Sequence, residues 1–381
     1  IVLPRANPDG AAAGRRDNAA GVDVDRDQLA LATPEAQALA ALLREYQPAV
    51  VVDLHEYDPL VPWAAKFGAV PGADVLLQYA STPNLAPFVT RAAEEWFRAP
   101  LIDALAREQL RSDWYATTPD DPADRSVSMG SIVADTLRNV AGLRHAVGML
   151  VESRGVGLGR HELQRRVHAQ VTAASSLLAS TAARAADLAK LRAYVEAEVS
   201  AQACQGEAVV TAARTHSEHS LLLLDPASGA DKWRTVDWES ALDLQPRITR
   251  PRPCGYWLAA DAAPAVRRLR EQGVQVRQLA ENASAKGDEY GIATPGSAVT
   301  ALKAAAGPLR HGGTPLVTID ALIDMPAGSY YVPLTQPLAN LAIAALEPDA
   351  PASYVAAGVI ADAAQVARVR VPPAGSFNDV P

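Results

Sequence analysis

Apolar positions in the first half of the chain alternate between short continuous runs and helix-like spacing. Residues 49–54 and 144–152 are largely apolar runs of strand length, which is typical of strands that are buried on both faces. Helical spacing follows a Thr-Pro start signal over residues 33–46, and similar patterns cover about residues 85–110 and 160–191. This alternation predicts an α/β domain with a largely parallel mixed sheet flanked by helices.

Two stretches of the first half lack such patterns. Residues 1–10 are expected to be the end of a strand followed by a turn at Asn7-Pro8-Asp9-Gly10, a combination that favours turns. Residues 58–84 show no clear period and are expected to form a loop.

The pattern changes near residue 204, where short β-like runs replace the long helices. A helix is predicted at about residues 264–272 and a strand at 274–276. We therefore expect two domains, residues 1–203 and a smaller β-rich domain of residues 204–381. In the second, His216-Ser217-Glu218-His219 contains metal-binding residue types but is expected to be an exposed loop.

The composition is that of an ordinary globular protein. The 381 residues are 49% hydrophobic and 20% charged, with a formal net charge of -8, so a nucleic-acid partner is not expected. No apolar run reaches the roughly 18 residues of a membrane helix, so no transmembrane segment is expected. Cys204 and Cys254 either form one disulfide or remain two buried thiols, and the sequence leaves both open.

Polar motifs lie where the predicted strands end. The turn at Asn7 is followed by Arg16 and by Gly-Val-Asp-Val-Asp-Arg at residues 21–26. His55 closes the first apolar run in Asp-Leu-His-Glu, and Glu152 closes the second. Because strand ends line the ligand crevice of an open α/β sheet, we expect His55 and Glu152 to point into one crevice.

In this order the motifs resemble those of the zinc carboxypeptidases, also called funnel-shaped metallocarboxypeptidases. The resemblance covers residues 1–200, and residues 326–348 resemble part of a bacterial branch of the family. It implies one zinc ion and hydrolysis of the C-terminal peptide bond, or a related amide, of a peptide or cell-wall peptide. It also implies a periplasmic or secreted location, since related bacterial proteins are often exported.

The resemblance also implies roles for individual residues. His55 matches the third zinc ligand, Glu152 matches the general base, and Arg16 matches the catalytic arginine. Asp25 and Arg26 occupy the places of an Asn-Arg pair that holds the C-terminal carboxylate of the substrate.

The chemistry of these residue types agrees with the implied roles. A catalytic zinc takes three protein ligands and leaves one position for water, whose proton a carboxylate such as Glu152 accepts. The charge and fixed donors of a guanidinium suit a developing oxyanion, with Arg16 as the first candidate and Arg15 as the next. Arg26 suits a bidentate grip on a carboxylate.

The zinc ligands are the first departure from the family pattern. The family carries a His-x-x-Glu pair before the Asn-Pro-Asp-Gly turn, and residues 1–6 contain neither His nor Glu. We therefore expect a chain truncated at its N-terminus, with two ligands upstream of Ile1. As given, the chain is expected to be inactive unless another segment supplies them, because His55 alone holds zinc weakly.

Two further departures concern the substrate. Asp25 replaces Asn, which is unfavourable beside a substrate carboxylate unless a cation compensates it; one hypothesis is that Asp25 binds a positive group of the terminal residue. No Tyr lies between Tyr115 and Glu152 to match a mobile tyrosine of the family. Three arginines of that region are candidates for substrate binding, namely Arg125, Arg138 and Arg144.

A second hypothesis is a catalytically inactive relative that binds peptide or cell-wall termini without cutting them. The missing ligands favour this alternative. The presence of Glu152, His55 and Arg26 favours an enzyme, because a binding module has no need of a general base.

Overall fold

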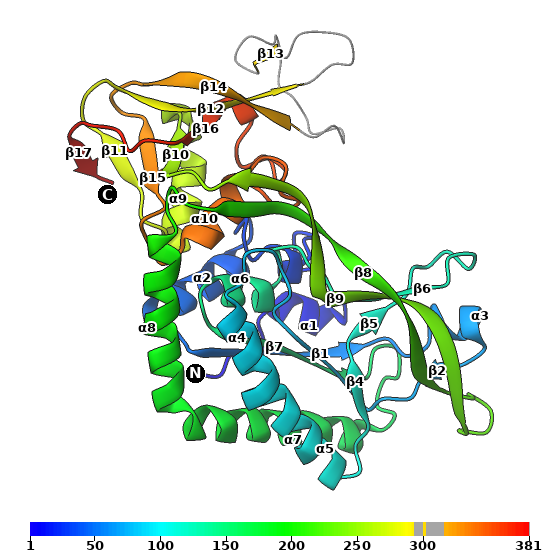
Figure 1. The fold of residues 1–381 in the computed structure, drawn as a ribbon. Coiled ribbons are helices and arrows are strands. Elements are labelled where there is room, and N and C mark those ends of the chain that lie inside the picture. The colour runs from blue at the N-terminus through cyan, green and yellow to red at the C-terminus, as the bar shows by residue number, and fades with distance from the viewer. Residues whose placement is uncertain (293–299, 302–315, 381) are drawn as a thin grey trace.

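The computed structural model describes residues 1–292, 300–301 and 316–380 (Figure 1). A central sheet of the first half contains β1 (Val50–Tyr57), β3 (Val75–Tyr79), β4 (Ser112–Trp114) and β7 (Val147–Arg154). Its four strands have the order β1-β7-β3-β4. β1 pairs with β7 and β3 pairs with β4 in parallel, whereas β3 and β7 are antiparallel. The predicted α/β class is confirmed.

Helices cover both faces of this sheet (Figure 1). α6 (Leu137–Leu143) contacts β1 and β7 from one side, and α7 (Leu163–Ala183) contacts them from the other. Gly148 allows α6 to lie close to β7, because a Cβ atom at this position would be 2.3 Å from the carbonyl oxygen of Arg138. Since side chains alternate along a strand, Leu150 and Glu152 share the α6 face of β7 with Gly148.

Local signals fix the helix boundaries. α2 (Pro34–Tyr46) follows Thr33, whose hydroxyl accepts a hydrogen bond from the N–H of Ala36, and it ends at Gln47 in the left-handed conformation. The predicted helix over residues 85–110 is divided by a π-helical segment, and the one over 160–191 breaks at Arg184 and then continues. The segments of these two predicted helices, apart from α7, are α4 (Pro87–Ala92), η2 (Ala93–Arg98), α5 (Ala99–Arg107) and α8 (Ala185–Ala201).

The turn predicted at residues 7–10 is wrong, and residues 1–6 form no strand. Asn7 instead caps α1 (Pro8–Ala13), because its side-chain oxygen accepts a hydrogen bond of 2.9 Å from the N–H of Gly10. Asn and Pro serve a helix start as well as a turn, so the same residues fit both structures.

The loop predicted at residues 58–84 is also wrong in part. This stretch contains α3 (Trp63–Phe67), β2 (Val70–Pro71) and β3. β3 is buried along its whole length and is too short to show a period, so the alternation that marks a half-buried strand is absent. The strand predicted at residues 274–276 lies further along, as β11 (Arg277–Leu279).

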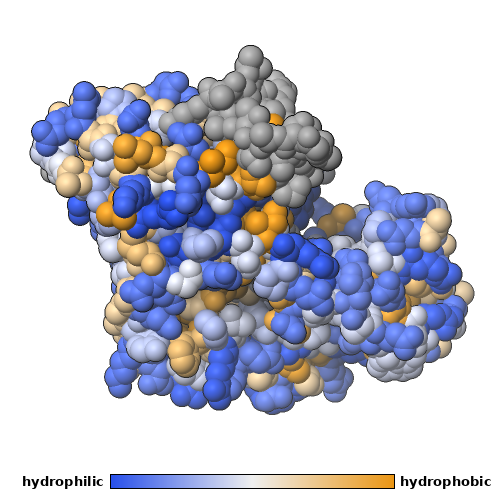
Figure 2. Space-filling model, turned by 45° about the horizontal axis from the view of Figure 1, so that its top comes forward, coloured by the Kyte–Doolittle hydropathy of each residue, from blue (hydrophilic) through white to orange (hydrophobic). Residues whose placement is uncertain are grey.

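A long hairpin of β8 (Glu207–Leu224) and β9 (Asp231–Pro251) reaches from the second half back across the first (Figure 1). It forms a five-stranded sheet in the order β2-β8-β9-β6-β5 with β5 (Ala116–Thr117) and β6 (Ser126–Met129). In the space-filling view, this end of the molecule forms a lobe at the right (Figure 2). Residues 216–219 lie in β8, so the predicted loop is wrong, although His216 and Glu218 are exposed.

The remaining strands form an eight-stranded sheet at the top of Figure 1. Along its path the order is β13-β12-β16-β10-β15-β11-β17, and β14 pairs with β12. The strands are β10 (Gly255–Leu258), β12 (Ala283–Ile292), β13 (Thr300–Ala301), β14 (Leu316–Met325), β15 (Tyr330–Pro333), β16 (Val366–Val369) and β17 (Phe377–Asp379). The helices here are η3 (Ala260–Ala262), α9 (Ala263–Glu271), α10 (Ala339–Leu346) and η5 (Ala363–Gln365).

A large hydrophobic cluster contains buried residues of both halves. A single cluster of buried residues includes Leu29 and Met149 from the first half and Tyr256 and Leu341 from the second. The domain boundary at residues 203 and 204 stays a prediction, since the apolar packing is continuous across it.

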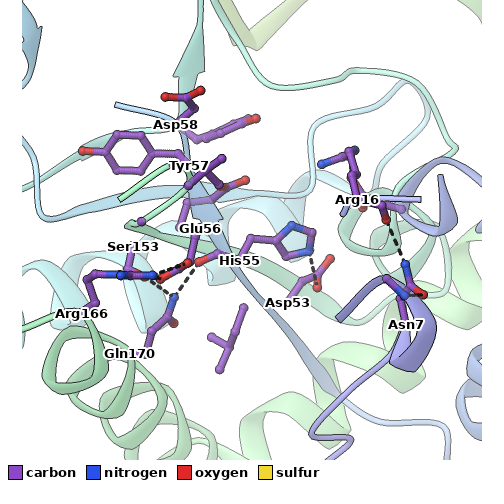
Figure 3. A pocket seen from close by; sticks show the side chains of 18 of the residues that line it. Asn7, Arg16, Asp53, His55, Glu56, Tyr57, Asp58, Ser153, Arg166 and Gln170 are labelled. Atoms are coloured by element: carbon purple, nitrogen blue, oxygen red, sulfur yellow. Dashed lines mark hydrogen bonds and ion pairs between the residues drawn. The ribbon is translucent and has the colours of Figure 1, made fainter. Parts of the chain in front are cut away.

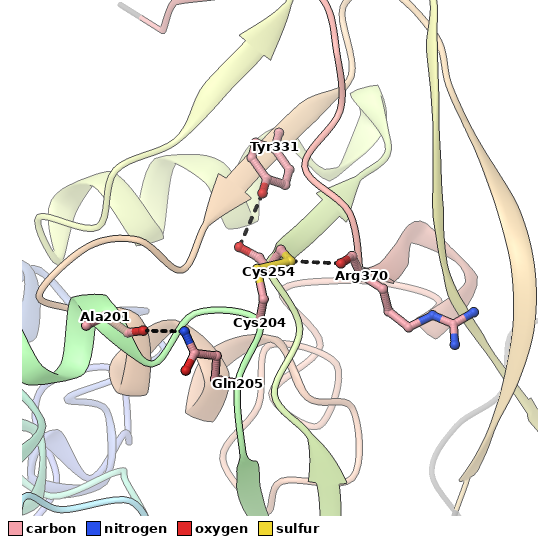
Figure 4. Close-up of a disulfide and its surroundings, with 6 residues drawn as sticks. All are labelled: Ala201, Cys204, Gln205, Cys254, Tyr331 and Arg370. Atoms are coloured by element: carbon pink, nitrogen blue, oxygen red, sulfur yellow. Dashed lines mark hydrogen bonds between the residues drawn. A yellow bond between two sulfur atoms is a disulfide. The ribbon is translucent and has the colours of Figure 1, made fainter.

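A disulfide joins Cys204, just after α8, to Cys254, just before β10 (Figure 4). The disulfide is therefore the correct one of the two alternatives that the sequence left open. None of the helices in the described ranges is long and apolar enough to cross a lipid bilayer.

Candidate active site

His55 and Glu152 lie side by side on neighbouring parallel strands. They are register partners on β1 and β7, so their side chains leave the sheet on the same face. Both line a cavity of about 1190 Å³ at the carboxyl end of these strands. This placement agrees with the expectation that both side chains point into one crevice. Their roles remain predictions.

The surroundings of these two groups shift their pKa values in the same direction. Burial raises the pKa of Glu152, which is 6% exposed, to about 7, although the nearby His55 opposes this. Burial alone would lower the pKa of His55, but the hydrogen bond and charge of Asp53, with smaller effects of Glu152 and Asp25, raise it to about 9. His55 Nε2 lies 2.8 Å from Asp53 Oδ1. Near pH 7 the imidazole of His55 is therefore protonated, while the carboxyl of Glu152 is close to half protonated.

The loop that contains Asp25 forms one wall of the cavity. Asp23 accepts a hydrogen bond from the N–H of Asp25 and so starts the short helix η1 (Val24–Arg26). Arg16 donates to Asp23 at 2.7 Å and to Asp25 at 3.0 Å, while Arg26 donates to Asp25 at 2.5 Å. Two guanidinium groups thus compensate the negative charge of Asp25. This agrees with the expectation from the sequence that a carboxylate at this position needs a cation beside it.

Arg16 has a second anchor in Asn7, the residue that caps α1. The Asn7 side chain donates a hydrogen bond of 2.9 Å to the carbonyl oxygen of Arg16, on the right of Figure 3. Arg15 also lines the cavity, but its guanidinium donates to the carbonyl oxygen of Asn18. Of the two candidates, Arg16 is the one that is bonded to the Asp23-Asp25 loop.

The opposite wall comes from α7 and contains residues that sequence reasoning missed. Arg166 binds both carboxylate oxygens of Glu56, at 2.8 and 2.7 Å. Gln170 donates to the carbonyl oxygen of His55 at 2.7 Å and to the hydroxyl of Ser153 at 3.0 Å (Figure 3). These bonds tie the ends of β1 and β7 to α7. The only signal in the sequence is that Arg166 and Gln170 are four residues apart on a helix.

A smaller chamber of about 200 Å³ lies beside Glu152. Its lining consists of Arg16, Asp23, Asp25, Arg26, Tyr115, Arg138, Leu150 and Glu152. The sequence left three arginines as candidates for this region, and of these Arg138 lines the chamber. Arg125 instead stacks 5.2 Å from the ring centre of Phe67, and Arg144 donates to the carbonyl oxygen of Gln272.

The site offers donors for a cation. Asp25, Asp53 and His55 each place one ligand atom so that all three atoms lie within 4.8 Å of one another. One imidazole and two carboxylates are a donor set that zinc accepts, so these residues fit the expected metal. Within the described ranges, residues 216–219 are not part of such a group.

Curated fungal proteins are similar to most of the chain. Carboxypeptidase 2 of Trichophyton rubrum and Carboxypeptidase 2 of Trichophyton equinum are each 24% identical over 371 residues, which is 94% of this chain and 66% of the relative. Probable carboxypeptidase 2 of Trichophyton verrucosum (strain HKI 0517) is 24% identical over 358 residues, 91% of this chain and 66% of the relative.

The chain thus spans 66% of the length of these relatives. No family model matches the chain, and no solved structure matches it. The similarities support a carboxypeptidase family. The bacterial branch and the zinc type remain predictions, since the relatives named here are fungal.

Proposed function

We propose that the protein is a zinc-dependent carboxypeptidase that releases the C-terminal residue of a peptide or cell-wall peptide, or cleaves a related amide. The observation that supports this most strongly is the pairing of His55 with Glu152 on adjacent strands, at the edge of one large cavity. A metal ligand and a general base must flank the same water molecule, and these two residues are placed for that.

His55 would be one ligand of the metal. A zinc ion at this site would polarise the scissile carbonyl and lower the pKa of a water molecule. The sequence contains no His-x-x-Glu pair. The other ligands would therefore be that pair from outside these 381 residues, or Asp53 and Asp25 within them.

The residues of the chain have separate tasks in the proposed reaction. Glu152 accepts a proton from the attacking water, and a pKa of about 7 allows it to exchange protons at neutral pH. Arg16 donates to the oxyanion that develops on the former carbonyl oxygen. Arg26, oriented by Asp25, holds the terminal carboxylate of the substrate. The protonated Glu152 then donates to the leaving amine.

We also infer that the protein works in an oxidising compartment, periplasmic or secreted. The disulfide between Cys204 and Cys254 supports this, because such bonds persist outside the reducing cytosol.

A second candidate function is binding without hydrolysis. The lack of a His-x-x-Glu pair in these 381 residues favours it, because a protein that only binds a peptide does not need the zinc ligands.

The test combines zinc content and hydrolysis. Protein expressed from its whole reading frame, and the His55→Ala variant, are analysed for zinc and incubated with an N-acylated dipeptide. His168→Ala is the control, because His168 is half exposed on α7 and bonded to Glu108. We expect one zinc ion and release of the terminal residue in wild type and control, and neither in His55→Ala. Peptide binding without hydrolysis in zinc-loaded wild type would favour the binding function instead. Stoichiometric zinc in the 381-residue chain alone would point to Asp53 and Asp25 as ligands.

A further inference from the structure

Arg138 is a buried cation that forms no ion pair with an acidic side chain of the described ranges. Arg138 is 3% exposed. Its Nη2 atom donates a hydrogen bond of 2.9 Å to the carbonyl oxygen of Ser131. The Nε atom has no hydrogen-bond partner, and no carboxylate in the described part of the chain lies within ion-pair distance of it. Buried arginines are rarely left in this state, because a charge in the interior needs a partner.

The backbone holds Arg138 firmly in this place. Its carbonyl group packs against Gly148 of β7, where even a Cβ atom would collide. The end of the guanidinium packs against Gly130, since a Cβ atom there would lie 2.8 Å from Arg138 Nη2. Gly148 thus makes room for the backbone at Arg138 and Gly130 makes room for the end of its guanidinium, so packing sets the position of both.

Of the three arginines that line the chamber, Arg138 is the one without an ion pair to a carboxylate of a described residue, and Glu152 is the nearby acidic group whose pKa it lowers. Arg16 and Arg26 are bonded to Asp23 and Asp25. Burial lowers the pKa of Arg138 from its ordinary value, the direction expected of a cation that lacks compensation. An anionic group that enters the chamber would supply the missing partner.

The chamber is placed to receive part of a substrate that is cleaved beside Glu152. Glu152, Tyr115, Arg16, Asp23 and Asp25 line both the chamber and the large cavity, so the two spaces adjoin. Leu150 and the Tyr115 ring offer apolar contact for the stem of a side chain. A volume of about 200 Å³ is well above the roughly 30 Å³ of one water molecule.

We propose that this chamber is the subsite for an acidic side chain of the substrate's C-terminal residue, and that Arg138 binds the carboxylate of that side chain. The inference rests on the proposed function, because it takes the scissile bond to lie at Glu152. It replaces the hypothesis that Asp25 selects a positive group, since Asp25 is already bonded to two guanidinium groups.

A peptide offers Arg138 a second carboxylate, the terminal α-carboxylate, which every peptide carries. A side chain that ends in Gln keeps the shape of Glu and the α-carboxylate but lacks the side-chain charge. Peptides that differ only in a final Glu, Gln, Leu or Lys therefore separate the two sources.

The experiment measures kcat/KM for these four peptides with wild type, Arg138→Gln and Arg138→Lys. Arg144→Gln is the matched control, because Arg144 is also buried and also donates to a backbone carbonyl but lines neither cavity. We expect wild type and control to prefer Glu over Gln by at least about 100-fold, as buried polar sites reject analogues that leave them unpaired. Arg138→Gln is expected to reduce this ratio to within about threefold, and Arg138→Lys to give an intermediate value.

The ratio is taken within one preparation, so partial unfolding of a variant does not change it. An equal loss for all four peptides in Arg138→Gln would overturn the proposal in favour of the α-carboxylate, and so would a wild-type enzyme that does not prefer Glu.

A binding measurement covers the case in which wild type cleaves none of the peptides and the proposed function fails. The thermal midpoint of the protein is measured with N-acetylglutamate and with N-acetylglutamine in the presence of a chelator. A larger shift with N-acetylglutamate in wild type, lost in Arg138→Gln, would support the subsite. Equal shifts, or none, would overturn it.

Discussion

Replacing Glu152 by Gln tests the electrostatics of the site through stability instead of catalysis. The pKa of Glu152 is raised from 4.5 to about 7, mainly by burial. The folded protein therefore binds this proton more tightly than the unfolded chain. The contribution of this group to the free energy of unfolding is therefore fully present below pH 4.5 and is lost as the pH rises towards 7. Gln cannot ionise, so the variant escapes this loss.

The size of the effect follows from the displacement of the pKa. At about 1.36 kcal/mol per pH unit, a rise from 4.5 to about 7 corresponds to roughly 3 kcal/mol. Part of this loss has already occurred at pH 5. We therefore expect the free energy of unfolding of Glu152→Gln, relative to wild type, to increase by roughly 2.5 kcal/mol between pH 5 and pH 8.

Urea unfolding followed by circular dichroism at pH 5, 6, 7 and 8 measures this difference. A chelator is present throughout, so that no metal ion changes the pKa of Glu152 or His55. Glu45→Gln is the control, because Glu45 is exposed on α2 and lines neither cavity; its difference from wild type should stay constant. If the difference for Glu152→Gln is also constant, or falls with pH, the assignment of a buried, proton-holding Glu152 is refuted.

Two predictions concern the second half of the molecule. Replacing both Cys204 and Cys254 by Ser removes a disulfide that spans a sequence separation of 50. The chain-entropy relation gives an expected loss of about 4 kcal/mol in the free energy of unfolding. Equal urea midpoints for the variant and the oxidised wild type would contradict this. Glu347→Gln removes a fully buried carboxylate that binds Arg250 at 2.7 Å and Arg368 at 3.0 Å. Urea unfolding should show that the free energy of unfolding falls by about 3–5 kcal/mol. A fall of less than about 1 kcal/mol would contradict this prediction.

The parts of the fold that local signals determine were predictable from the sequence. The N-cap Thr33 and Pro34 specify the start of α2, and the apolar runs mark β1 and β7. The proximity of His55 and Glu152 also follows from the sequence, because strands that end on polar residues in a parallel arrangement place those residues at one edge. Other features depend on contacts between distant segments, which a local pattern does not contain.

Arg138 illustrates such a feature. It lies in the short helix α6, whose backbone packs against Gly148 in β7, and the end of its guanidinium packs against Gly130 after β6. The double ion pairing of Asp25 likewise depends on the way the loop folds back towards Arg16. Neither glycine stands out in the sequence, so Arg138 could be named there only as one of three candidates.

The central claim is that Glu152 acts as the general base beside a metal held by His55. It is tested most directly by measuring kcat/KM and zinc content on the same samples of wild type and Glu152→Gln, expressed from the whole reading frame. We predict that kcat/KM falls by about 10²–10⁴-fold while the zinc content is unchanged. A Glu152→Gln enzyme that retains zinc and cleaves the peptide at nearly the wild-type rate would contradict the claim.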